Sequence, residues 1–132
     1  MKNDKQILII EPERISGLDL QLQLEKKGFS VQRPVSLVDT EAIIVKDKPD
    51  IIIADTIIKK QTLFERIKKY LKKFQLPFIW IGDLTKNEVK KETDGINVIE
   101  NFSKPFDSQK VVAFIVNYFK KKIRPVISPV KA

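Results

Sequence analysis

Short apolar runs alternate with helix-like segments along the chain. Three runs of four residues, 7–10, 51–54 and 78–81, are uninterrupted and consist mostly of β-branched or aromatic side chains. Continuous apolar runs of this kind are typical of strands that are buried on both faces, as in a parallel sheet. Two weaker segments, 29–32 and 97–99, predict two further strands.

Segments with helical periodicity lie between and after these runs. In segment 63–74 the apolar residues form one stripe, and the opposite face is rich in lysine. Ser36 is the expected N-cap of one helix, and Asp107 or Ser108 is the expected N-cap of the last. We expect helices over residues 15–27, 37–47, 63–74, 85–92 and 107–122.

The first of these helices carries an ambiguous pattern. Leu18, Leu20, Leu22 and Leu24 alternate strictly with polar residues, which is a strand pattern. However, leucine, glutamine, glutamate and lysine favour helices, and Gly28 stands where a helix C-cap would. The sequence therefore predicts a helix over 15–27.

Strands and helices that alternate in this way predict an α/β fold, in which a parallel sheet carries helices on both faces. Ligands bind such sheets beyond the carboxyl ends of the strands. The charged residues that follow the predicted strands are Glu11, Glu13, Asp55, Asp83 and Lys104. Clustered carboxylates repel one another unless a cation joins them, and Mg²⁺ prefers such oxygen ligands. One aspartate can then attack a phosphoryl group while the metal and the lysine neutralise its oxygens.

Composition narrows the functions that the chain can have. The 132 residues include no cysteine and no histidine, which excludes disulfides, thiolate metal sites and imidazole bases. We expect one domain over residues 1–122 and an extended tail over 123–132. No apolar run suits a membrane span and no signal peptide opens the chain, so we expect a soluble, cytoplasmic protein. The net charge of +8 comes largely from lysines on polar helix faces, which are typical of solvated surfaces rather than of nucleic-acid binding.

Four segments, in their order along the chain, resemble a known family. They are Ile7–Glu11, Pro49–Asp55, Leu76–Ile81 and Ser103–Phe106. With these segments the chain is similar to the receiver domains of two-component response regulators. The resemblance implies a flavodoxin-like fold of five strand–helix units, with a parallel sheet in the order 2-1-3-4-5. It also implies a signal-transduction domain rather than an enzyme.

The resemblance assigns roles to individual residues. Asp55 matches the aspartate that accepts a phosphoryl group from a histidine kinase or a phosphotransfer protein. Lys104 matches the lysine that pairs with this phosphoryl group. Mg²⁺ in the family is held by an acidic pair, the phosphoacceptor and a backbone carbonyl two residues beyond it. These positions correspond here to Glu11, Asp55 and Ile57, with Glu13 as a substitute ligand.

Departures from the family pattern include three positions that bear on phosphorylation or on its readout. Pro12 replaces the second acidic residue and removes a metal ligand, which bears on phosphorylation itself. Gly82 replaces the hydroxyl residue that reads the phosphoryl group, and Asn101 replaces the aromatic residue that follows its movement. These two losses bear on the readout alone. Two hypotheses therefore stand: a receiver that is phosphorylated on Asp55, and a degenerate pseudo-receiver that binds a partner without phosphorylation.

The last predicted helix carries a wide apolar face. Its apolar residues cover an arc of about 200° at 3.6 residues per turn, whereas a helix packed on a sheet needs an arc of somewhat over 100°. Phe114 and Tyr118 lie at one edge of the arc. They predict an interface for a homodimer or another partner.

A third class of function is a small flavodoxin-like enzyme or cofactor carrier. The residues after the first strand are Glu11, Pro12 and Glu13 in place of a glycine-rich phosphate loop. Carboxylates there would repel the phosphates of a nucleotide or flavin, so the sequence disfavours this class.

Overall fold

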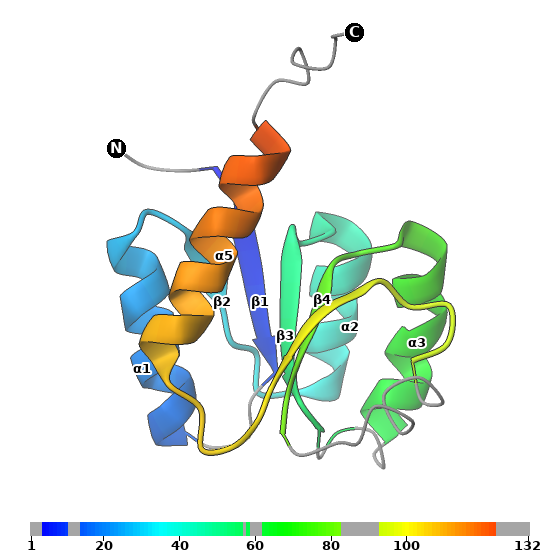
Figure 1. The fold of residues 1–132 in the computed structure, drawn as a ribbon. Helices are drawn as coiled ribbons and strands as arrows, with labels where there is room; N and C mark the ends of the chain where they lie inside the picture. The colour runs from blue at the N-terminus through cyan, green and yellow to red at the C-terminus, as the bar shows by residue number, and fades with distance from the viewer. Residues whose placement is uncertain (1–3, 11–13, 57, 59–61, 83–92, 124–132) are drawn as a thin grey trace, which may run out of the picture.

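A five-stranded sheet with helices on both faces forms the protein (Figure 1). The computed structural model describes residues 4–10, 14–56, 58, 62–82 and 93–123. In chain order the elements are β1 (Gln6–Ile10), α1 (Arg14–Lys26), β2 (Ser30–Gln32), α2 (Leu37–Asp47), β3 (Ile51–Asp55), α3 (Thr62–Phe74), β4 (Phe78–Ile81), β5 (Val98–Phe102) and α5 (Ser108–Ile123). The helix expected over 85–92 lies outside the described residues.

The strands are all parallel and follow the order β2-β1-β3-β4-β5. The flavodoxin-like topology that the sequence predicts is therefore confirmed. β3 lies in the middle of the sheet, where Ile53 pairs with Ile9 of β1 and with Ile79 of β4. Because all strands run the same way, their carboxyl ends meet at one edge of the sheet, which we call the carboxyl edge.

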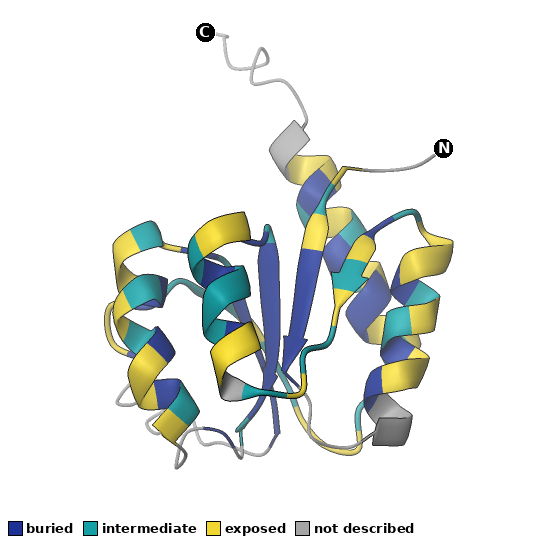
Figure 2. Cartoon of the chain, turned by 180° about the vertical axis from the view of Figure 1, so that it is seen from behind, coloured by how far each residue is buried: buried dark blue, intermediate teal, exposed yellow. Residues whose placement is uncertain are grey.

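Within the described part of the chain, the helices are divided between the two faces of the sheet (Figure 1). α1 and α5 pack on one face, where Leu20 and Leu24 meet Val111 and Ile115 in one core. α2 and α3 pack on the other face and bury Ile44, Phe64, Ile67 and Leu71 in a second core. Figure 2 shows the buried central strands between helices whose outer faces are exposed.

The helical period determines which of the alternating leucines of α1 are buried. Leu20 and Leu24, four residues apart, are both fully buried against the sheet. Leu18 and Leu22, also four residues apart, are 49% and 50% exposed. A strand would have placed all four leucines on one face. The helix predicted over 15–27 is therefore confirmed.

The helix caps agree with the predictions. Ser36 Oγ accepts a hydrogen bond of 3.0 Å from the Asp39 backbone N–H at the start of α2. At the start of α5, Asp107 Oδ1 accepts a hydrogen bond of 2.9 Å from the Gln109 N–H, so Asp107 rather than Ser108 is the cap.

β5 is longer than the predicted segment 97–99 and reaches Phe102. It is an edge strand whose residues are half-buried or exposed, so its apolar pattern is weak. α5 ends at Ile123, and residues 124–132 of the expected tail lie outside the described residues. None of the helices in the described part of the chain is long and apolar enough to span a membrane.

Candidate functional site

A buried carboxylate marks the carboxyl edge of the sheet. Asp55 is the last residue of β3, a strand in which every residue is buried, and it is only 3% exposed. The apolar run before it makes β3 a central strand, and the end of this strand carries Asp55 to the edge. A carboxylate that is buried in this way is costly unless it is paired.

Lys104 is the partner of this carboxylate. Its Nζ donates a hydrogen bond to Asp55 Oδ2 and forms an ion pair with it. Lys104 lies two residues beyond the end of β5, and β4 separates β5 from β3 in the sheet. The Lys104 side chain is 39% exposed, so the pair has one buried and one solvent-facing member. The structure thus brings the predicted phosphoacceptor and the predicted phosphoryl-binding lysine together.

Gly82 follows β4 and lies beside Thr56. The register pairs Asp55 with Ile81, so Thr56 and Gly82 are the next residues along their two strands. Gly82 is buried and has φ +143°, a conformation that side chains with a β-carbon rarely adopt. A β-carbon on Gly82 would lie 2.0 Å from Thr56 Oγ1 and 2.8 Å from Thr56 Cγ2. The side chain of Thr56 therefore fills the space that a residue other than glycine would need.

Asn101 on β5 holds the end of β4. Its Nδ2 lies 3.4 Å from the carbonyl oxygens of both Trp80 and Gly82 and donates to them. The Gly82 N–H in turn donates to the Phe102 carbonyl oxygen at 2.7 Å. Where the family pattern has an aromatic residue, this chain has an amide that bonds to the neighbouring backbone.

The rest of the predicted site falls on residues that the structure does not describe. These are the acidic residues Glu11, Glu13 and Asp83, the substituted position Pro12 and the carbonyl residue Ile57. Among the described residues, no group of three or more acidic side chains is placed to hold a metal ion. The metal ligands expected from the sequence therefore remain predictions.

Phe114 and Tyr118, the predicted interface residues, are half-buried on α5. Phe114 stacks on Tyr118 with ring centroids 6.3 Å apart and meets the edge of Phe102 at 6.0 Å. Both residues pack against the core that α1 and α5 share, so part of each side chain is used within the domain.

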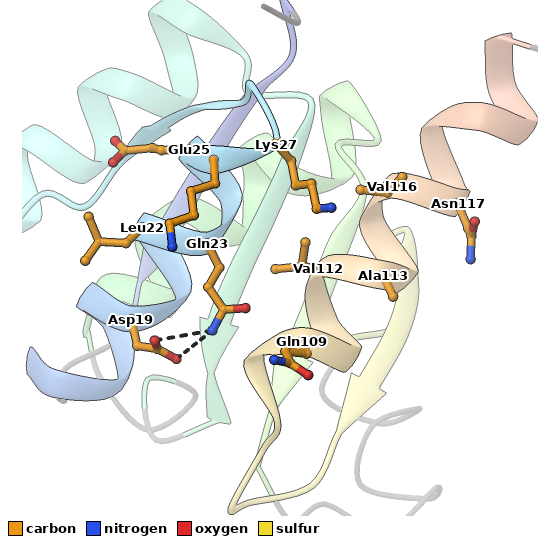
Figure 3. Close-up of a pocket in the computed structure, with 11 residues that line it drawn as sticks. Asp19, Leu22, Gln23, Glu25, Lys27, Gln109, Val112, Ala113, Val116 and Asn117 are labelled. Carbon is orange, nitrogen blue, oxygen red and sulfur yellow. Dashed lines mark hydrogen bonds between the residues drawn. The ribbon is translucent and has the colours of Figure 1, made fainter. Parts of the chain in front are cut away.

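A groove of about 1060 Å³ lies between α1 and α5 (Figure 3). Leu22, Val112 and Val116 contribute apolar side chains to it, and Asp19 and Gln23 line it from α1. Gln23 Nε2 donates to both carboxylate oxygens of Asp19, at 3.1 and 3.3 Å. Neither Asp55 nor Lys104 lines the groove.

Asp19 joins α1 to the start of α5. A hydrogen bond from the Ser108 side chain, a second one from Gln23 and the charge of Lys26 lower the pKa of Asp19 below its ordinary value. Each of these partners favours the ionised carboxylate, so the contact is strongest when Asp19 is charged.

Sequence reasoning missed two side chains near the carboxyl edge. Thr56 follows Asp55 directly at the end of the predicted strand, but the sequence pattern assigns no role to its side chain. Arg33 follows β2 and lies over the backbone of α1, where a β-carbon on Gly17 would be 2.6 Å from its Nη2. Nothing in the local sequence indicates this contact, because it joins two elements across the edge of the sheet.

Comparisons with known proteins find transcriptional regulators that are similar to this chain in sequence. The chain is 24% identical over 110 residues to the DNA-binding dual master transcriptional regulator RpaA of Synechocystis sp., and this match covers 81% of the chain and 46% of the relative. It is 28% identical over 116 residues to the probable transcriptional regulator ycf29 of Porphyra purpurea, over 84% of the chain and 54% of the relative. The chain thus spans about half the length of these relatives. No protein-family model matches the sequence.

The structural comparison covers most of the chain. A two-component response regulator from Clostridium difficile superimposes with a TM-score of 0.73 at 17% identity, over 92% of this chain and 100% of that one. At this identity the likeness establishes the fold. The chain therefore has the receiver-domain fold of two-component response regulators, and the resemblance predicted from its sequence is confirmed.

Proposed function

We propose that the chain is a signalling receiver, rather than an enzyme, that accepts a phosphoryl group on Asp55 from the histidine of a kinase or phosphotransfer protein. The observation that carries this proposal is the pair of Asp55 and Lys104 at the carboxyl edge. Asp55 is the only aspartate among the buried polar and charged residues of the described chain. It is held at a place where α/β sheets bind their ligands.

The chemistry follows from the two side chains. A carboxylate oxygen of Asp55 attacks the phosphorus atom, the phosphorus–nitrogen bond of the donor breaks, and the donor imidazole takes up a proton from water. The ammonium of Lys104, already beside the carboxylate, neutralises charge on the phosphoryl oxygens. The Lys104 side chain is 39% exposed, so this cation is reached from solvent, the side from which a phosphoryl donor approaches.

A magnesium ion at this edge is the second part of the proposal. Within the described residues the donor set is a single carboxylate, that of Asp55, which is paired with an ammonium and does not form a magnesium site by itself. The proposed ligands Glu11, Glu13 and the Ile57 carbonyl lie outside the described residues, so no step is derived through the metal. Chemical-shift changes of the Asp55 region during a Mg²⁺ titration would test whether this site exists.

Phosphorylation itself is tested by mass. Incubation with Mg²⁺ and acetyl phosphate is expected to add one phosphoryl group per chain, and Asp55→Asn is expected to abolish the gain. Asp47→Asn, which changes an exposed carboxylate of α2, is the matched control and is expected to keep it. A wild-type chain that gains no mass at millimolar Mg²⁺, and does not respond to beryllofluoride, would contradict the proposal.

A pseudo-receiver that binds its partner without phosphorylation is the second candidate function. The observation that favours it is the end of β4, where the Asn101 amide bonds to two backbone carbonyls and Gly82 offers no hydroxyl. A receiver that changes conformation on phosphorylation needs a segment that can move. The contacts of Asn101 favour a single arrangement of the ends of β4 and β5. No response to phosphate donors, combined with unchanged partner binding by Asp55→Asn, would favour this candidate.

The partner surfaces belong to the same proposal. We expect a homodimer or partner contact through Phe114 and Tyr118, in the cytoplasm where a phosphorelay operates. Sedimentation at high protein concentration should show self-association that Phe114→Asp removes. A monomer that this substitution leaves unchanged would contradict the dimer. Binding to nucleic acid is not expected, and DNA retention that falls with salt would contradict that expectation.

A further inference from the structure

We propose that the hydroxyl group of Thr56 donates a hydrogen bond to the phosphoryl group on Asp55 and takes the place of a side chain at Gly82. This inference rests on the proposed function, since it needs a phosphoryl group on Asp55. It names the neutral side-chain donor that, together with the ammonium of Lys104, receives this group at the carboxyl edge.

The geometry around Gly82 places the hydroxyl. Thr56 Oγ1 lies 2.0 Å from the position that a β-carbon on Gly82 would occupy, a separation little longer than a single covalent bond. The oxygen thus lies within the space that the side chain of a serine or threonine at position 82 would need. The two side chains exclude each other, because Thr56 Cγ2 and Cβ would also lie 2.8 and 2.9 Å from that β-carbon. The hydroxyl at this point of the edge therefore belongs to Thr56, which follows β3, and not to the residue that follows β4.

The neighbourhood of Asp55 requires a donor. A phosphoryl group adds up to two negative charges and three strong acceptor oxygens to a side chain that is 3% exposed. Lys104 supplies one charged donor. Asn101, a polar side chain on β5, directs its amide to the carbonyls of Trp80 and Gly82. Thr56 is adjacent to Asp55 in the chain and half-buried at the same edge, and its hydroxyl is a donor that can rotate to suit an acceptor.

Isosteric substitution separates the hydroxyl from the shape of the side chain. Thr56→Val keeps the branched shape over Gly82 and removes the donor, Thr56→Ser keeps the donor, and Thr56→Ala removes the donor with less bulk. Because a hydrogen bond to a charged group is lost, we expect Thr56→Val and Thr56→Ala to bind beryllofluoride about tenfold to a hundredfold more weakly in Mg²⁺. Thr56→Ser is expected to stay within about threefold of the wild type.

A second hydroxyl at the same edge provides the control. Ser103 is exposed just after β5, next to Lys104, and Ser103→Ala is expected to bind beryllofluoride as the wild type does. Binding is followed by the fluorescence of Trp80, the single tryptophan, which lies on β4 two residues before Gly82. Thermal unfolding of each variant shows whether it is folded at the assay temperature, and a merely structural role of Thr56 would change the melting temperature without separating serine from valine.

The outcomes distinguish this inference from the proposed function. If the wild-type chain binds beryllofluoride and Thr56→Val binds it equally well, the inference fails and the proposed function stands. The inference also fails if Thr56→Ser loses as much affinity as Thr56→Val, or if Ser103→Ala shows the loss instead. If the wild-type chain binds no beryllofluoride and takes up no phosphoryl group, the proposed function fails and this inference fails with it.

Discussion

The contact between Gly82 and Thr56 can be tested through stability alone. Gly82→Ala places a β-carbon where the structure has Thr56 Oγ1 at 2.0 Å, and it does so in a backbone conformation with φ +143°. A conformation of this kind costs a residue other than glycine about 1–3 kcal/mol. Overpacking of a well-filled site costs about another 1–3 kcal/mol. We therefore expect the free energy of unfolding to fall by about 2–6 kcal/mol. This is a large part of the roughly 5–15 kcal/mol by which native domains are stable.

A double-mutant cycle divides this cost between strain and overlap. Thr56→Ala removes Oγ1 and Cγ2, so that the nearest remaining Thr56 atom, Cβ, lies 2.9 Å from the new β-carbon. The backbone strain at Gly82 is unchanged. The double variant should therefore be about 1–2 kcal/mol more stable than the sum of the two single changes predicts.

Urea unfolding, followed by Trp80 fluorescence, measures all four corners of the cycle. Trp80 is fully buried, so its emission reports global unfolding. A Gly82→Ala variant within about 0.5 kcal/mol of the wild type would refute the strained conformation. A cycle in which the two changes simply add would show that Thr56 does not fill the space over Gly82.

Other stability measurements test α1, the buried ion pair and the groove. Leu24→Ala, at a fully buried side chain, is expected to cost about 2–5 kcal/mol, and the half-exposed Leu22→Ala under about 1 kcal/mol; equal costs in urea unfolding would contradict the assigned faces. Lys104→Ala takes the ammonium from a carboxylate that is 3% exposed, and because Lys104 is 39% exposed the cost is expected to be about 1–3 kcal/mol. Asp55→Asn should cost less, because water solvates the lysine that remains, and the opposite order would contradict this account. Because the pKa of Asp19 is lowered in the folded protein, its ionised carboxylate contributes to the free energy of unfolding. This contribution is fully present above an ordinary aspartate pKa of about 3.9, and it disappears as pH falls through the lowered pKa. Asp19→Asn should therefore differ from the wild type near neutral pH and match it in strong acid, whereas a difference that did not change with pH would contradict the assignment.

Much of the fold follows from local sequence. The runs 7–10, 51–54 and 78–81 form β1, β3 and β4, because continuous apolar segments must be buried on both faces. Ser36 and Asp107 begin their helices because their side chains satisfy backbone N–H groups at a helix start. These signals act over a few residues and do not depend on what packs beyond them.

The candidate site was predictable in part. Asp55 and Lys104 come together because parallel strands carry their carboxyl ends to one edge, which follows from the alternation of strands and helices. The strand predicted over 97–99 is shorter than β5. The reason is that β5 is an edge strand, which is buried only in part and therefore has a weak apolar pattern. The metal ligands Glu11, Glu13 and Ile57 remain predictions.

Tertiary structure alone decided the contacts between neighbouring strands. The sequence shows that Gly82 stands where the family pattern has a hydroxyl residue. Only the structure shows that Thr56 occupies the space that a side chain at position 82 would need, because this contact depends on the register of β3 and β4. The same holds for Asn101, whose amide meets Trp80 and Gly82 across the sheet. Local patterns determine which segments become strands, because burial depends on the residues of the segment itself. Which side chains then touch depends on register and strand order, and these are set by the packing of the whole sheet.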